Sequence, residues 1–154
     1  MQISRILSHT AVKTVSAVTS KKRLFQEVAE LAAGAYDLPA DRALSALLER
    51  ESLGPTAVGH GVALPHARME EVDAVVAVFL RLERPLDFDA ADRQPVDLVF
   101  SLFAPEKSGV DHLKALAAAS RAMRNEHICA KLRANTKPAA LHAILTELEA
   151  SQAA

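Results

Sequence analysis

The sequence predicts an α/β fold, with a mixed parallel and antiparallel sheet between helices on both faces, in a single domain that spans residues 1–154. Two short segments, 73–82 and 96–103, are rich in branched apolar residues, as expected of strands covered on both faces. Segments with apolar residues at helical spacing precede and follow them. A chain of 154 residues suits one core, and no repeat, linker or shift in composition divides it.

Two helices are expected before the strands. Ser20 can cap a helix over 21–36, in which the apolar residues recur at helical spacing. Pro39 can open a second helix over about 40–52, and Gly54 is the type of residue that ends one. Both helices present one apolar stripe, so each is expected to lie against the sheet.

The segment between the two predicted strands contains Pro85 and several aspartates, which favour turns. It predicts a short strand at about 86–88 followed by a tight turn. Beyond the second strand, Ser108 and Asp111 have the spacing of a capping box that opens a helix over about 109–123.

Two more helices complete the expected fold. Asn125 can cap a short helix that ends at about Arg133. Thr136 and Pro138 can start a last helix that ends at about residue 149, and the tail 150–154 is expected to be frayed.

Composition excludes several classes of function. The chain has 18 basic and 19 acidic side chains, so it lacks the basic patch that nucleic-acid binding usually needs. No apolar run is long enough for a signal peptide or a membrane span, so we expect no membrane insertion. The single cysteine, Cys129, cannot form an internal disulfide, which favours a reducing compartment and predicts a cytoplasmic protein.

One histidine stands in a setting that suits a reactive side chain. His66 follows a short apolar run that starts at Gly61, and Pro65 before it removes a backbone donor from a sheet ladder. We expect the strand to stop at Pro65 and to lift the imidazole clear of the sheet. An unprotonated imidazole can attack phosphorus near neutral pH without a separate base, and the labile phosphoramidate that results suits a carrier of phosphoryl groups.

Groups that could stabilise a phosphoryl group stand nearby in the sequence or at a helix start. Arg50 offers a fork of N–H donors, and Ser52 and Thr56 offer hydroxyls. His112 falls at the start of the predicted helix 109–123, where the helix dipole disfavours imidazolium and a neutral ring could donate to phosphate. His60, His66 and His112 lack acidic or cysteine partners at ligand spacing, so no metal site and no cofactor is expected.

Three separated motifs carry a resemblance to a known family. They are the run from Arg50 to His66, the segment 86–98, and His112 with Leu113. Together they resemble the nitrogen-regulatory enzyme IIA proteins, which belong to the mannitol and fructose type of IIA domain of the bacterial phosphoenolpyruvate-dependent phosphotransferase system. The likeness covers the core, residues 6–148.

This resemblance implies a role for each matching residue. It implies that His66 accepts a phosphoryl group on Nε2 from the phosphohistidine of an HPr-like carrier, and that His112 and Arg50 are active-site residues. The chain departs from the family pattern at Pro55 and His60, and Ala67-Arg68 replaces a glycine and a lysine. Arg68 keeps the positive charge, so it is expected to bind phosphate with Arg50, Ser52 and Thr56.

The resemblance also implies partners. Nitrogen-regulatory members act by binding other proteins according to phosphorylation state, and potassium-transport or sensor components are the targets it suggests. The chain is thus expected to be a phosphocarrier and regulator rather than a stand-alone turnover enzyme. Two alternatives stay open: a sugar-specific enzyme IIA that passes phosphate to a IIB domain, and a binding module whose histidine does not turn over.

Overall fold

The computed structural model describes residues 1–107 and 109–153, with side chains described as far as Glu147. That part of the chain forms six helices and six strands. In chain order these are α1 (Ile3–Ile6), β1 (Leu7–Val15), α2 (Lys21–Tyr36), α3 (Ala40–Glu51), β2 (Ala57–Gly59), β3 (Val62–Ala63), β4 (His66–Met69), β5 (Val76–Leu86), β6 (Val96–Pro105), α4 (Val110–Arg124), α5 (Glu126–Arg133) and α6 (Pro138–Ala153).

The strands form one mixed sheet with the order β1-β5-β6-β3-β2, and β4 also pairs with β6. β1 runs parallel to β5, β3 and β4 run parallel to β6, and the pairs β5 with β6 and β2 with β3 are antiparallel. Both kinds of pairing therefore occur in the sheet, as the predicted fold class requires.

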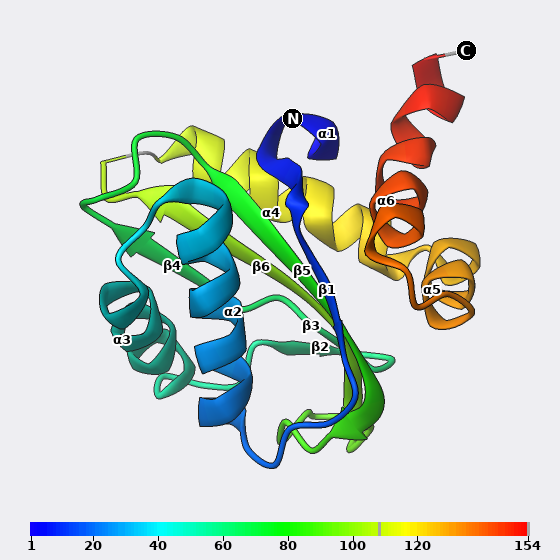
Figure 1. Ribbon diagram of the computed structural model, residues 1–154, viewed down its shortest axis with the longest axis horizontal. Helices are drawn as coiled ribbons and strands as arrows, with labels where there is room; N and C mark the ends of the chain where they lie inside the picture. Colours follow the sequence, from blue (N-terminus) through cyan, green and yellow to red (C-terminus); the bar gives the residue numbers. More distant parts are fainter. Residues whose placement is uncertain (108, 154) are drawn as a thin grey trace.

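Helices cover both faces of this sheet. Ala77, Val78, Phe79 and Leu80 are consecutive in β5 and each is 0% exposed, so neither face of the strand meets solvent. α2 and α3 pack against each other, and α2 contacts β1 and β5. α4, α5 and α6 form a second group, in which α4 contacts β6 and α6 contacts β1 (Figure 1). The predicted sandwich of one sheet between two helical layers is confirmed.

The predicted helices occur with small shifts of their ends. α2 spans the predicted residues, and Ser20 caps it by accepting a hydrogen bond from Arg23 N. The Asn125 side chain caps α5 by accepting from His127 N and Ile128 N. Ser108 of the expected capping box lies outside the described residues, and α4 begins at Val110. α6 continues to Ala153, past the expected end at about residue 149.

The short separate strand expected at 86–88 is wrong. Pro85 and Leu86 belong to β5, and the pairing register with β6 shifts between Arg81 and Leu86. This irregularity accommodates Pro85, which has no N–H to give to a ladder and is exposed at the end of the strand. Phe88 follows outside any strand, 0% exposed and edge-on to Phe25 of α2.

The expectation that the strand stops at Pro65 is also corrected. β3 and β4 are two parts of one strand, because Val62 pairs with Leu98 and His66 pairs with Leu102 in the same register. The strand is interrupted only at Leu64 and Pro65, where proline cannot donate to the ladder. His66 therefore lies within the sheet as the first residue of β4, and its side chain is half-buried.

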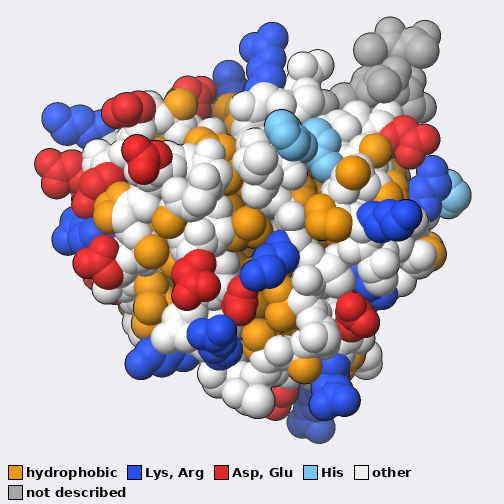
Figure 2. Space-filling model, viewed as in Figure 1, with side chains coloured by type: hydrophobic (Ala, Val, Ile, Leu, Met, Phe, Trp, Pro, Cys, Tyr) orange, Lys and Arg blue, Asp and Glu red, His pale blue; other side chains and the backbone are white. Residues whose placement is uncertain are grey.

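The visible surface carries charges of both signs. Figure 2 shows Lys and Arg side chains interspersed with Asp and Glu over this face, in keeping with the formal net charge of -1. Among the described residues, no helix is both long enough and apolar enough to cross a membrane.

Candidate functional site

The backbone just before His66 fixes the orientation of its imidazole. Nδ1 of His66 lies 2.8 Å from the carbonyl oxygen of Leu64. A carbonyl can only accept, so Nδ1 must carry the proton in this contact. In a neutral ring, the other nitrogen then has a free electron pair. This arrangement leaves Nε2 as the nitrogen with an available electron pair.

The peptide that leads into His66 is held from the opposite side by β6. The carbonyl oxygen of Pro65 accepts hydrogen bonds from Leu102 N and from the Ser101 hydroxyl, each at 2.9 Å. Ser101 is 0% exposed and is one of few polar side chains in the core. Sequence reasoning assigned it no role, although a hydroxyl inside an apolar strand is a signal that a buried acceptor must be nearby.

His112 lies in the first turn of α4 and faces His66. The two ring centroids are 5.5 Å apart, with an angle of 48° between the ring planes. His112 is 7% exposed, and its Nδ1 has no hydrogen-bond partner among the described residues. Burial, followed by the nearby charges of His66 and Arg68, lowers the pKa of His112 below its usual value. The ring is therefore kept neutral near neutral pH.

Arg68 joins these two histidines. It stands two residues after His66 in β4, so both side chains project from the same side of the strand. Its guanidinium is exposed and close enough for its charge to act on His112. His66, His112 and Arg68 thus form one cluster, the histidine–arginine cluster, which combines a nucleophilic nitrogen, a neutral imidazole and a cation.

Arg50 and Ser52 lie at the end of α3, which packs against β4. Nη1 of Arg50 donates to the carbonyl oxygen of Gly54 at 3.1 Å. A guanidinium has five N–H groups, so this bond leaves donors for an anion. The Ser52 hydroxyl donates to the carbonyl oxygen of Glu49 at 2.6 Å, which engages its proton within the helix end.

Thr56 is 6% exposed and is bound to a residue that sequence reasoning did not single out. Both its backbone N–H and its hydroxyl donate to the carboxylate of Glu51, at 2.9 to 3.1 Å. With the hydroxyl proton engaged, Thr56 has no proton for a phosphate oxygen in this geometry. The phosphate-binding roles of Thr56 and Ser52 stay predictions, and each would require its hydroxyl to turn away from the acceptor it now has.

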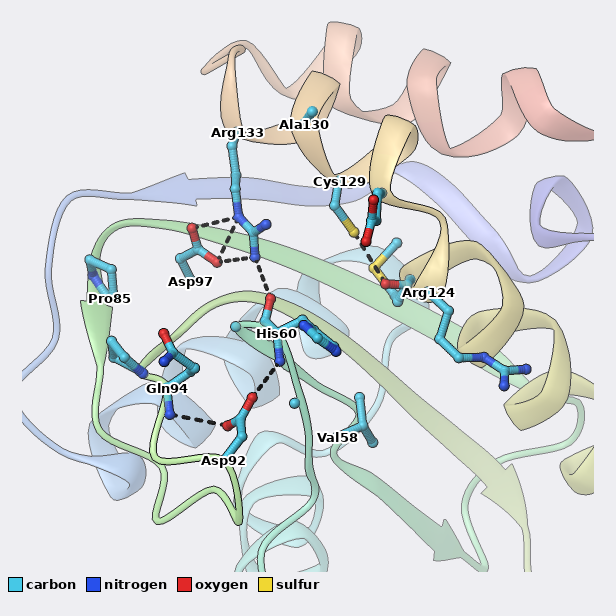
Figure 3. Close-up of a pocket in the computed structure, with 15 residues that line it drawn as sticks. Val58, His60, Pro85, Asp92, Gln94, Asp97, Arg124, Cys129, Ala130 and Arg133 are labelled. Atoms are coloured by element: carbon cyan, nitrogen blue, oxygen red, sulfur yellow. Dashed lines mark hydrogen bonds and ion pairs between the residues drawn. The ribbon is translucent and has the colours of Figure 1, made fainter.

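A cavity of about 1040 Å³ lies elsewhere, between the β2–β3 turn and α5 (Figure 3). Arg133 closes one side of it by binding Asp97 through Nε and Nη2 and by donating from Nη2 to the carbonyl oxygen of His60. The lining includes neither His66 nor His112. The part of the chain that the structure describes also holds no group of three or more His, Cys, Asp or Glu side chains that could bind a metal ion.

Comparison with known proteins identifies what this arrangement resembles. Residues 5–148 match the family model described as phosphoenolpyruvate-dependent sugar phosphotransferase system, EIIA 2. The matched range contains His66, His112 and all four of the residues expected to bind phosphate.

Individual relatives agree with that match. The chain is 43% identical over 145 residues to the nitrogen regulatory protein of Bradyrhizobium diazoefficiens, covering 94% of this chain and 95% of the relative. It is 37% identical over 150 residues to the nitrogen regulatory protein of Escherichia coli, covering 97% and 92%. The crystal structure of nitrogen regulatory protein IIA-Ntr from Neisseria meningitidis superposes with a TM-score of 0.85 at 35% identity, covering 94% of this chain and 99% of that one.

Proposed function

Because this chain belongs to the EIIA type-2 family of the phosphoenolpyruvate-dependent sugar phosphotransferase system, we propose that it is a phosphocarrier and regulatory protein that accepts a phosphoryl group on His66. The observation that carries the assignment of His66 is its contact with Leu64. This contact holds the proton on Nδ1 and leaves Nε2 free to attack.

The proposed transfer needs no general base. The electron pair of Nε2 forms the new N–P bond, while the N–P bond of the donor breaks and its electron pair returns to the donor imidazole. Such transfers depend on in-line positioning and on stabilising the equatorial oxygens. Arg68 supplies positive charge on the same side of β4, Arg50 has unused N–H groups, and neutral His112 can donate a hydrogen bond.

The donor is proposed to be a protein. Proteins of this family interact with phosphocarriers and with other components of the phosphotransferase system. Val110 and Leu113 flank His112 on α4 and are 64% and 63% exposed, so both present apolar surface beside the cluster. They support a protein partner at the histidine–arginine cluster, and an HPr-like phosphocarrier is the proposed one.

A regulatory role is favoured over sugar transport. The relatives named nitrogen regulatory protein match along almost their whole length. We therefore propose that the phosphorylation state of His66 controls binding to target proteins, with potassium-transport or sensor components as candidates, and that the protein acts in the cytoplasm. The sugar-specific alternative predicts efficient discharge of the phosphorylated protein onto a IIB domain, which the regulatory role does not.

Substitution of the acceptor tests the proposed function. With enzyme I, an HPr-like carrier and phosphoenolpyruvate, the wild-type protein should gain one acid-labile phosphate, measurable by intact mass and lost in acid. His66→Ala should gain none, because the substitution removes Nε2, the proposed acceptor atom. His127→Ala, at an exposed position on α5, is the control and should label like the wild type. Labelling that persists in His66→Ala would contradict the assignment, and unlabelled wild type would leave only the binding-module alternative.

A further inference from the structure

Glu51, the last residue of α3, has a buried carboxylate bound to one residue of the following loop. Its side chain is only 8% exposed. Both carboxylate oxygens accept from the N–H and the hydroxyl of Thr56, and the Nζ of Lys21 lies 3.9 Å away. A buried charge that is hydrogen-bonded and accompanied by a cation is not a solvated surface group, so it holds Thr56 in a defined place.

Thr56 is in turn bound to the residue that orients the reactive histidine. Its carbonyl oxygen accepts from Leu64 N at 3.0 Å, and the carbonyl oxygen of Leu64 receives Nδ1 of His66 at 2.8 Å. Hydrogen bonds through two intervening residues thus connect the carboxylate of Glu51 to the imidazole ring.

The bond between Leu64 and Thr56 extends the antiparallel pairing of β2 with β3. Leu64 follows β3, and its N–H binds Thr56, the residue before β2, one position beyond the last paired residues of the two strands. The next residue, Pro65, has no N–H of its own. On this side of the chain, the orientation of the Leu64 carbonyl therefore depends on Thr56, and Thr56 depends on Glu51.

We propose that Glu51 is a positioning residue for phosphoryl transfer, which keeps the proton of His66 on Nδ1 and the electron pair on Nε2. The inference rests on the proposed function of His66. When Thr56 loses its anchor, the Leu64 carbonyl is free to turn and the Nδ1–H bond weakens. The ring then exchanges with the tautomer that carries its proton on Nε2, and in that tautomer Nε2 has no free electron pair with which to attack phosphorus.

Glu51→Ala should change both the tautomer and the rate. Nitrogen NMR of ¹⁵N-histidine-labelled, unphosphorylated protein should show the His66 ring shifting from Nδ1–H toward a mixture. The rate of labelling by an HPr-like carrier should fall about three- to tenfold, the effect expected from one ordinary hydrogen bond. Glu51→Gln keeps an acceptor oxygen for Thr56 and should stay within about twofold of the wild type.

Matched measurements separate positioning from loss of folding. Glu49→Ala removes an exposed carboxylate from the same helix and should leave the His66 signals and the rate unchanged. Circular dichroism gives the folded fraction of each variant. If Glu51→Ala does not fold, Glu51→Asp is the second variant, because its side chain is one methylene shorter and holds the carboxylate further from Thr56. It should shift the nitrogen signals of the His66 ring in the same direction.

Three outcomes would overturn the inference, and they can be told apart. The inference alone would be overturned if the wild type is phosphorylated and a folded Glu51→Ala or Glu51→Asp variant shows the same His66 ring signals and the same rate as the wild type. A rate that falls only in proportion to the folded fraction would also overturn it. A wild type that takes up no phosphate would overturn the proposed function and the inference together.

Discussion

His112 is a buried imidazole with one nitrogen that has no hydrogen-bond partner in the described part of the chain, and its burial gives it a measurable effect on stability. Burial and the charges of His66 and Arg68 lower the pKa of His112 below 6.5, its ordinary value. Below that pH the unfolded chain binds a proton at this residue before the folded protein does. The free energy of unfolding therefore decreases as the pH falls below about 6.5 and stops decreasing once the pH is below the folded-state pKa.

Replacing His112 by Gln should remove this part of the pH dependence. Urea unfolding of the wild type between pH 8 and pH 5 should show stability falling with pH, and His112→Gln should show a smaller fall because its side chain does not titrate. His127→Gln, at an exposed position of α5, is the control and should fall like the wild type. Parallel curves for the wild type and His112→Gln would show that His112 is not held neutral by its surroundings.

The residue types of the cluster could be predicted from the sequence, but their hydrogen bonds could not. The sequence around His66 indicates a reactive imidazole, and the sequence around His112 indicates the start of a helix. Thr56 was expected to give its hydroxyl to phosphate, yet that proton goes to Glu51. Whether a hydroxyl is free depends on which acceptor the fold places beside it, and local sequence does not carry this information.

At the scale of elements, the turn between β2 and β3 depends on a glycine. Gly61 has φ +79°, and a Cβ there would lie 2.6 Å from Nη2 of Arg133 and 3.0 Å from Oδ1 of Asp97. These two side chains form the ion pair that closes the cavity of Figure 3, and the bond to Asp97 and its charge raise the pKa of Arg133. A side chain at Gly61 would therefore strain the backbone and displace the ion pair.

Two glycine substitutions should have opposite effects. Gly61→Ala should lower the free energy of unfolding by about 2 kcal/mol, because a positive φ and a close contact are both unfavourable for alanine. Gly34→Ala, on the exposed side of α2 where a Cβ meets no atom within 4 Å, should raise it by about 0.5 to 1 kcal/mol. Urea denaturation measures both changes in the free energy of unfolding, as shifts of the midpoint with an unchanged dependence on urea concentration. Equal effects of the two substitutions would contradict the proposed strain at the turn.

Most elements could be predicted because their apolar spacing is regular, and β1 shows where that signal fails. Its burial pattern has two adjacent buried residues, Ala11 and Val12, and its register with β5 shifts between Leu7 and Val12. A bulge of this kind destroys the two-residue alternation that identifies a strand. The hydroxyl of Tyr36 lies at this irregularity, where it accepts from Ser8 N and donates to backbone carbonyl oxygens of Ile6 and Ala77.

At the scale of the whole molecule, the fold separates two regions along α4. His112 lies at the start of this helix, beside His66, and Arg124 at its end lines the cavity between the β2–β3 turn and α5. Arg124 follows His112 by 12 positions in the helix, a rise of about 18 Å, so the histidine–arginine cluster and the cavity are distinct places. The layers could be predicted from alternating strand and helix patterns, but the strand order could not, because no local pattern tells which strands pair.

The separation allows a direct test of where the phosphocarrier docks. Leu113→Gln replaces an exposed apolar side chain beside His112 with a neutral polar one, so it does not alter the charge felt by phosphate. If the carrier buries Leu113, the rate of labelling at low carrier concentration should fall about tenfold, as for a central apolar contact of an interface.

Val58→Gln is the matched control, since Val58 is 53% exposed and lines the distant cavity. It should keep the wild-type rate, and neither change should lower stability by more than about 0.5 kcal/mol. Equal labelling rates for both variants would place the docking surface away from the start of α4. A lower labelling rate for Leu113→Gln alone would show that the partner that delivers the phosphoryl group binds the apolar residues beside His112.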